Sequence, residues 1–321
     1  MTRPTLDDVY RARQRVGPLV RRTPLLPSAW LAGACGADVH LKLESLQLTR
    51  SFKIRGALNA IAAVAAAGGP DVSVVTASAG NHGLALACAA KVARVPVTIF
   101  TPAGAPAAKL EPIAQYGATL HAVATDYDDA ERRALAYAAE HGAVYVSPYS
   151  HPDVIAGAGT VALEVLDELP DVDTILVPVG GGGLVSGIAL AAKGVRPSTR
   201  VVGVEAANNP VFARSLAAGT VTHVDVLPTI ADGLAGNLEP GSLTFEMVRD
   251  LVDDMVVVSE DGLRAAIRGL AAHEHLIAEG AGVPAVAALL SGRVDVSGRR
   301  TVAIVSGANI DVALLAEVLS A

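Results

Sequence analysis

Short runs of β-branched residues alternate along the chain with longer stretches whose apolar residues recur at helical spacing. The short runs lack polar alternation, which is typical of parallel strands that are buried on both faces. Strands are predicted over residues 39–43, 72–76, 97–100, 119–123, 144–147, 174–179, 201–204, 255–258 and 301–306. Helices are predicted over residues 81–94, 128–140, 263–275 and 310–319. The pattern therefore predicts an α/β protein whose mainly parallel sheets are covered by helices.

The length and the absence of an obvious linker bear on domain organisation. The 321 residues, 51% of them hydrophobic, suffice for one large domain or two. No stretch rich in serine, proline or charge divides the chain, so two domains would be interwoven. The longest uncharged run, residues 175–192, contains Pro178 and four consecutive glycines, and it predicts a strand, a loop and a helix rather than a membrane span.

Charge and cysteine content narrow the function classes. The net charge is −7 without a basic run, and aromatic residues make up 3% of the chain, so nucleic-acid binding is not expected. Cys35 and Cys88 are too few for a disulfide framework, and the N-terminal residues show no apolar signal segment. These features predict a cytoplasmic protein.

A glycine loop is the strongest candidate for a binding site. Gly180–Gly183 follow the predicted strand 174–179 and precede a helical stretch, so their backbone N–H groups face an incoming anion at a helix N-terminus. The loop lacks the Gly-Lys-Ser/Thr ending of a nucleotide P-loop, which favours a phosphate group other than a magnesium triphosphate. A flexible turn is the alternative, but four consecutive glycines cost much conformational entropy.

Lys53 is a candidate nucleophile. It stands in the sequence Ser51-Phe52-Lys53-Ile54-Arg55-Gly56, ahead of an apolar helical stretch. With Ser51 as N-cap, Lys53 would lie in the first helical turn, where the helix dipole helps to lower a lysine pKa as a Schiff-base lysine requires. Taken alone, the motif fits an ordinary surface lysine better than a nucleophile.

A second loop of small residues follows the predicted strand 72–76. Its sequence Ser78-Ala79-Gly80-Asn81-His82 exposes backbone donors at a helix start, which suits a carboxylate. Asn81 and His82 could instead be caps and turn formers.

Taken together, these motifs resemble the fold-type II pyridoxal-phosphate enzymes. Within that family the chain is most similar to the threonine and serine dehydratases (ammonia-lyases) and to serine racemase. The resemblance runs nearly end to end and also includes Thr23-Pro24-Leu25, Lys42-Leu43-Glu44, Val154-Ile155-Ala156-Gly157, Ala231-Asp232-Gly233, Glu279-Gly280-Ala281-Gly282 and Ser306-Gly307-Ala308-Asn309. It implies two interwoven, open, twisted, mainly parallel sheets covered by helices, as in the β subunit of tryptophan synthase. The implied domains are a large one of residues 1–69 and 156–321 and a small one, 70–155, inserted in it.

The resemblance also implies a role for each motif. Lys53 would hold pyridoxal 5′-phosphate as a Schiff base and act as the catalytic base, with Phe52 beside the cofactor. Asn81 would bind the ring hydroxyl, Ser306 the pyridine nitrogen, and Gly233 would lie beside the ring. The implied phosphate-binding residues are Gly180, Gly181, Gly182, Gly183 and Leu184, and the implied residues for the substrate carboxylate are Ser78, Ala79, Gly80, Asn81 and His82.

The implied activity is α,β-elimination, which converts L-threonine or L-serine to a 2-oxo acid and ammonia. A bulkier or acidic substrate such as 3-phenylserine or 3-hydroxyaspartate is an alternative, as is racemisation of serine. Serine racemase carries a serine where Ala79 stands, and an alanine has no proton to give, so elimination is expected over racemisation. A homodimer without an appended regulatory domain is also implied.

Some positions depart from the family pattern. Arg50 replaces a usual glycine, and Ala158 replaces a frequent glutamine that would face the substrate. Relatives bind a divalent cation through a glutamate, a carbonyl and an aspartate. Here Glu205 and Asn209 match the first two, but Val211 stands at the aspartate position, so no metal site is expected.

Other signals are weaker. Gly157–Ala162 match the G-x-G-x-x-A dinucleotide fingerprint, so an NAD oxidoreductase is a second function class, although no convincing strand precedes the match. A non-catalytic cofactor-binding protein is a third class, against which the intact Lys53 and glycine loop argue. His273 and His275 are two residues apart and do not converge on a metal ion from one helix, so solvated helix surface is expected there.

Overall fold

The computed structural model describes residues 2–69, 71–239 and 241–320. Backbone contacts divide the chain into two compact units. Unit 1 comprises Met1–Val20 and Lys53–Ala158, and unit 2 comprises Arg21–Phe52 and Gly159–Ala321. The predicted division into domains 1–69 with 156–321 and 70–155 stays a prediction, and its boundary at residue 70 lies outside the described residues.

Unit 2 is built on a six-stranded sheet with the strand order β1-β2-β10-β7-β8-β9. Its strands are β1 (Leu25–Pro27), β2 (Asp38–Leu43), β7 (Thr174–Pro178), β8 (Arg200–Ala206), β9 (Asp254–Val258) and β10 (Arg300–Val305). All neighbours are parallel except β1, which pairs antiparallel with β2. The carboxyl ends of β7, β8 and β10 therefore meet at one edge of the sheet, where ligands bind in such folds.

Helices cover this sheet. Those that pack on its strands are α2 (Ala29–Cys35), α8 (Gly183–Val195), α9 (Val211–Ala218) and α12 (Pro284–Leu290). Three further helices pack against these: α10 (Leu243–Leu251) on α8, α11 (Glu260–Gly269) on α12, and α13 (Val312–Ser320) on α11. The helix α7 (Pro152–Glu168) contributes to both units. Aliphatic side chains fill the core between sheet and helices, for example Leu176, Val202 and Ala287, each with no exposed surface. The high alanine and valine content thus serves close helix-to-sheet packing.

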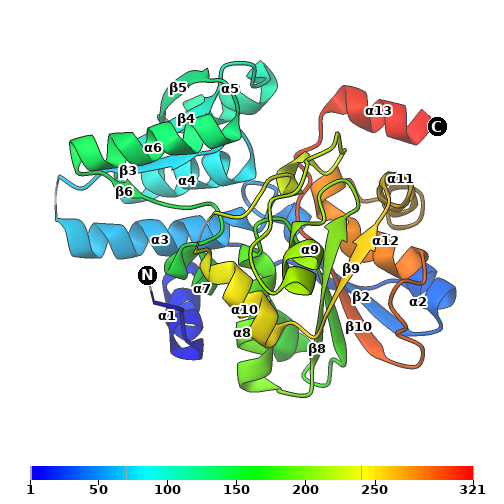
Figure 1. Cartoon of the computed structure of the whole chain (residues 1–321). Helices are drawn as coiled ribbons and strands as arrows, with labels where there is room; N and C mark the ends of the chain where they lie inside the picture. The colour runs from blue at the N-terminus through cyan, green and yellow to red at the C-terminus, as the bar shows by residue number, and fades with distance from the viewer. Residues whose placement is uncertain (1, 70, 240, 321) are drawn as a thin grey trace. The chain divides into compact units, whose positions relative to one another are not determined.

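Unit 1 contains a four-stranded parallel sheet with the strand order β5-β4-β3-β6. Its strands are β3 (Val74–Ala77), β4 (Val97–Pro102), β5 (Thr119–Ala124) and β6 (Val144–Tyr145), and its helices are α1 (Leu6–Val16), α3 (Lys53–Gly68), α4 (Asn81–Ala93), α5 (Ala107–Gln115) and α6 (Tyr127–His141). Val74 packs with residues of α3 and α4, whereas Val75 packs with residues of α6. Because successive strand residues face opposite sides, α6 covers one face of the sheet and α3 and α4 cover the other (Figure 1).

The predicted fold class is confirmed, with two mainly parallel sheets covered by helices. Each predicted strand is present with its ends shifted by a few residues, and β1 was not predicted. The predicted helix 263–275 differs, because α11 ends at Gly269 and a π-helical turn, Leu270–Glu274, follows. Across the described ranges, no helix combines the length and the apolar character that a membrane span needs.

Candidate active site

The glycine loop joins β7 to α8 at the carboxyl edge of the unit 2 sheet. Gly182 has a φ of +83°, in the left-handed region that favours glycine. A Cβ atom on Gly180 would lie 2.8 Å from Leu234 Cα, and one on Gly182 would lie 2.5 Å from Phe212 Cζ. Close packing therefore requires glycine at both positions, and backbone conformation requires it as well at Gly182.

The backbone amides of this loop are available to a ligand. Among the described residues, the amides of Gly180 through Leu184 donate no hydrogen bond to a protein acceptor, and the first bond at this helix start joins Ser186 N to Gly182 O at 2.9 Å. Gly182, Gly183 and Leu184 are buried, where an unpaired N–H group costs free energy. A phosphate group would satisfy these donors and the helix dipole together. The loop thus fits the phosphate of pyridoxal phosphate.

Thr244, on α10, holds the glycine loop through a hydrogen bond to its backbone. Its side-chain hydroxyl donates to the carbonyl oxygen of Gly181 at 2.7 Å, and it contacts the hydroxyl of Ser242 at 2.8 Å. No motif in the sequence points to Thr244, because a single threonine at a helix start is a common cap. Its hydrogen bond orients the Gly181 peptide, since the carbonyl is held on the protein side of the loop.

Ser306 follows β10, the strand next to β7, and so lies at the same edge of the sheet as the glycine loop. Its hydroxyl is buried and donates to Ala281 O at 3.1 Å, and its carbonyl accepts the Phe52 amide at 3.1 Å. A hydroxyl group can rotate to donate elsewhere and carries no charge. Ser306 therefore fits a neutral partner for a pyridine nitrogen.

Gly233 lies in a 3-10 turn, Asp232–Leu234, beside these residues. A Cβ atom on Gly233 would lie 3.1 Å from Ala281 Cβ, and the next residue, Leu234, packs against Gly180. Unit 2 thus brings Phe52, the glycine loop, Gly233 and Ser306 together.

Lys53 is the first residue of α3 in unit 1, as its predicted place in the first helical turn requires. Its ammonium group is half-buried and donates to Pro148 O at 2.7 Å. The predicted side-chain cap by Ser51 is wrong, since the buried Ser51 hydroxyl has no hydrogen-bond partner within the described part of the chain. Ser51 instead makes an isolated backbone bridge with Gly307.

His82 is buried in the first turn of α4. Its Nε2 lies 3.3 Å from Val146 O, which makes Nε2 the protonated nitrogen. Burial, reinforced by the positive charges of Lys53 and His151, lowers the His82 pKa to about 3, although the Val146 contact acts in the opposite direction. His82 is therefore neutral near pH 7 and adds no positive charge beside Lys53.

The predicted carboxylate-binding loop joins β3 to α4 in unit 1. Gly80 precedes the helix, which has no side-chain cap, and the Gly80 amide donates to the Ser78 hydroxyl at 3.2 Å. A Cβ atom on Gly83 would lie 2.4 Å from Ser78 O, so the turn needs glycine there. Ala79 and Asn81 are half-buried. Unit 1 thus holds Lys53 and the Ser78–His82 loop.

Two of the departures from the family pattern have a clear structural setting. Arg50 has a φ of +57°, which explains why a glycine suits that position, and its carbonyl accepts the Ala308 amide at 2.9 Å. Ala158 is buried within α7.

The candidate cation ligands make other contacts. The two carboxylate oxygens of the buried Glu205 accept the amides of Phe212 at 2.7 Å and Ala213 at 2.8 Å. Burial raises the Glu205 pKa to about 7, against the lowering effect of these two bonds. Val211, also buried, offers no oxygen from its side chain. Both oxygens of Glu205 are thus engaged with main-chain amides, and the expected lack of a metal site stays a prediction.

The remaining signals have structural explanations. Gly157 lies inside α7 rather than at a strand-to-helix turn, and a Cβ atom there would lie 2.6 Å from Arg55 O, so this glycine permits close packing of α7 on α3. His273 stacks on Trp30 with ring centroids 4.9 Å apart, and Glu274 accepts the Ser28 hydroxyl at 2.5 Å. Because Gly157–Ala162 lie inside α7, the dinucleotide fingerprint lacks the strand-to-helix turn that it requires.

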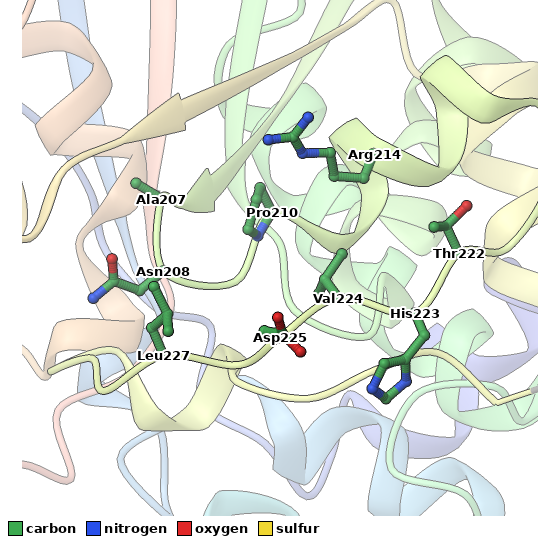
Figure 2. A pocket seen from close by; sticks show the side chains of 9 residues that line it. All are labelled: Ala207, Asn208, Pro210, Arg214, Thr222, His223, Val224, Asp225 and Leu227. Carbon is green, nitrogen blue, oxygen red and sulfur yellow. The ribbon is translucent and has the colours of Figure 1, made fainter.

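A hollow of about 350 Å³ lies elsewhere in unit 2, around the turn after β8. Figure 2 shows Arg214, His223 and Asp225 among the side chains that line it. None of the predicted site residues lines this hollow.

Comparisons with known proteins agree with the geometry. The chain is 42% identical over 316 residues to the L-threonine ammonia-lyase of Thermotoga maritima, a match that covers 98% of this chain and 78% of that protein. It is 38% identical over 317 residues to the catabolic L-threonine dehydratase of Escherichia coli K12, covering 98% and 95%.

Solved structures give the same picture. Maize serine racemase superimposes with a TM-score of 0.92 at 37% identity, covering 99% of this chain and 98% of that one. The processed form of threonine deaminase isoform 2 from Solanum lycopersicum has a TM-score of 0.90 at 31% identity, covering 99% and 94%. The family model described as pyridoxal-phosphate dependent enzyme matches residues 16–307. The chain belongs to the family of pyridoxal-phosphate-dependent enzymes.

Proposed function

We propose that this protein is an ammonia-lyase that eliminates water from a β-hydroxy amino acid such as L-threonine or L-serine and releases a 2-oxo acid and ammonia. The unpaired amides of Gly180 through Leu184 carry the proposal, because they suit the phosphate of the family's cofactor. The relatives named threonine ammonia-lyase and threonine dehydratase support the reaction.

When bound, pyridoxal phosphate supplies an electron sink that favours loss of the substrate's Cα proton and then of its β-hydroxyl group. Lys53 would hold the cofactor through its amine and, once free, remove the Cα proton. The bond from Lys53 to Pro148 O holds the amine in place, and His82, neutral near pH 7, adds no positive charge beside it.

Unit 2 would bind and orient the cofactor. The loop Gly180–Gly183 with Leu184 would bind the phosphate through N–H groups, and the Ser306 hydroxyl would donate to the pyridine nitrogen. A neutral partner leaves that nitrogen unprotonated, which favours rapid elimination over a long-lived carbanion. Phe52 and Gly233 would lie beside the ring.

Unit 1 would bind the ring hydroxyl of the cofactor and the carboxylate of the substrate. Asn81 would contact the ring hydroxyl of the cofactor, and the small residues Ser78, Ala79 and Gly80, with the amides of Asn81 and His82, would bind the substrate carboxylate. Ala79 offers no proton for the opposite face of the substrate, so elimination is proposed over racemisation.

The test is a substrate panel on the purified protein, with 2-oxo acid release and the visible absorption of the cofactor as readouts. The panel comprises L-threonine, L-serine, their D and allo forms, 3-phenylserine and 3-hydroxyaspartate. Release from L-threonine or L-serine is expected to exceed the others, and Lys53→Ala is expected to abolish both turnover and borohydride-trapped cofactor. Lys91→Ala, an exposed lysine on α4, is the matched control. Turnover that persists without Lys53 would overturn the assignment.

We also propose that the protein is a cytoplasmic homodimer. The resemblance to the threonine and serine dehydratases supports the dimer, and the two unpaired cysteines, Cys35 and Cys88, suit a reducing compartment. Light scattering tests the oligomeric state.

A further inference from the structure

A buried polar corner between β8 and α9 has no part in the proposed chemistry. It consists of Glu205, Asn209, Phe212 and Ala213, called here the β8–α9 corner. Glu205 has no exposed surface, and Asn209 is 2% exposed. Burying such polar groups costs free energy unless they are hydrogen-bonded, and a satisfied buried network makes its surroundings rigid.

Glu205 holds the start of α9. Pro210, the residue before the helix, gives it no side-chain cap. Instead, one oxygen of Glu205 accepts the Phe212 amide at 2.7 Å and the other accepts the Ala213 amide at 2.8 Å. A carboxylate at a helix N-terminus is also favoured by the helix dipole. The carboxylate therefore sets the position of Phe212.

Phe212 connects α9 with the phosphate-binding loop. Its ring is fully buried and lies so close to Gly182 that a Cβ atom there would be 2.5 Å from Cζ. Thr244 lies against the same position, with its Cβ 3.0 Å from that point. Movement of Phe212 would thus reach the loop directly, because close-packed groups transmit displacement.

Asn209 connects the corner with the other end of the loop. Its amide nitrogen donates to Leu234 O at 3.3 Å and to Gly236 O at 3.0 Å, and its side-chain oxygen accepts the Gly236 amide at 3.3 Å. Leu234 in turn packs against Gly180. The corner therefore supports the loop at Gly180 and at Gly182.

We propose that Glu205 and Asn209 are positioning residues that hold the phosphate-binding loop in shape, Glu205 through Phe212 and Asn209 through Leu234. This inference rests on the proposed function of that loop. Glu205 then contributes to cofactor affinity through its hydrogen bonds to main-chain amides of α9, and this contribution requires no cation.

The experiment compares two ligands of the apoprotein, pyridoxal phosphate and pyridoxal, which lacks the phosphate. Dissociation constants are measured from absorbance changes for the wild type and for Glu205→Gln. The glutamine keeps the shape, but its NH2 group faces an amide N–H, so one bond is lost and a buried donor is left unpaired. We expect Kd for pyridoxal phosphate to rise about tenfold or more and Kd for pyridoxal to change less than about twofold.

Three further variants complete the design. Glu317→Gln, an exposed acid on α13, is the matched control and should leave both constants unchanged. Asn209→Ser and Phe212→Leu test the two connections separately, and they keep the inference testable where Glu205→Gln fails to fold. Each is expected to weaken binding of pyridoxal phosphate selectively.

The outcomes separate the two proposals. A wild type with no preference for pyridoxal phosphate over pyridoxal would contradict the phosphate site itself. If the wild type prefers pyridoxal phosphate over pyridoxal and the folded corner variants show the same preference, only the positioning role is overturned. Equal losses for both ligands would also overturn it, because they would indicate general destabilisation.

Discussion

Lys53 lowers the pKa of His82: its positive charge adds to burial, and the imidazole pKa falls to about 3. The unfolded chain takes up a proton on this histidine below about pH 6.5, whereas the folded protein takes it up only near pH 3. His82 thus contributes a loss of stability as pH falls from 6.5 towards 3.

This relationship predicts that His82→Gln becomes less acid-labile than the wild type. Between pH 6 and pH 4 the free energy of unfolding should fall less steeply in the variant, by up to about 1.4 kcal/mol per pH unit for one proton. Urea unfolding at several pH values measures it. His141→Gln, which replaces an exposed histidine, is the control, and parallel curves for His82→Gln and the wild type would contradict the prediction.

Gly182→Ala should weaken cofactor binding and destabilise unit 2. The alanine meets a positive φ and the ring of Phe212 together, and a loss of about 1–3 kcal/mol in stability is expected. Gly219→Ala has a similar φ of +73° but nothing within 4 Å of the added Cβ, so it isolates the backbone strain. Thermal unfolding and titration with pyridoxal phosphate are the measurements. Equal effects of the two variants would remove the role assigned to packing.

Thr244→Val removes the hydroxyl that holds the Gly181 carbonyl while keeping the side-chain shape. A net hydrogen bond is worth about 1 kcal/mol, so affinity for pyridoxal phosphate should fall about fivefold. Thr199→Val is the matched control, because the buried Thr199 donates to Val172 O at 3.2 Å, a backbone acceptor outside the loop. An unchanged affinity in Thr244→Val would show that the loop needs no such anchor.

Ala79→Ser should raise the ratio of racemisation to elimination with L-serine, because it supplies a hydroxyl that can give a proton. Chiral chromatography of residual serine alongside 2-oxo acid release measures the ratio. Efficient racemisation by the wild type would contradict the proposed role of Ala79. Ala105→Ser, outside the predicted site residues, controls for the added hydroxyl.

The sequence predicted the strand, loop and helix around Gly180–Gly183 because local signals there agree: β-branched residues, glycines, then helical spacing. It placed Lys53 in the right helical turn for the wrong reason, since Ser51 does not cap it. It could not predict Phe212, Asn209 or Thr244 as supports of the loop. Their contacts depend on which segments fold together, and no periodicity or motif encodes that information.

The short strand β1 illustrates the same limit. Only Leu25–Pro27 pair with β2, and a proline in so short a run argues against a strand. Antiparallel pairing at the sheet edge tolerates it, because an edge residue needs bonds on one side only. The edge position is a property of the whole sheet, and local sequence does not reveal it.

Recognition of an anion by main-chain groups has a consequence for how cofactor retention varies with acidity. The amides of Gly180 through Leu184 have no ionisable side chain, so the protein half of this contact stays constant over the pH range in which enzymes work. The pH dependence that these amide contacts themselves contribute then comes from the ligand's own second ionisation, near pH 6. A negatively charged protein can hold a dianion in this way without placing a single lysine or arginine in the loop that binds it.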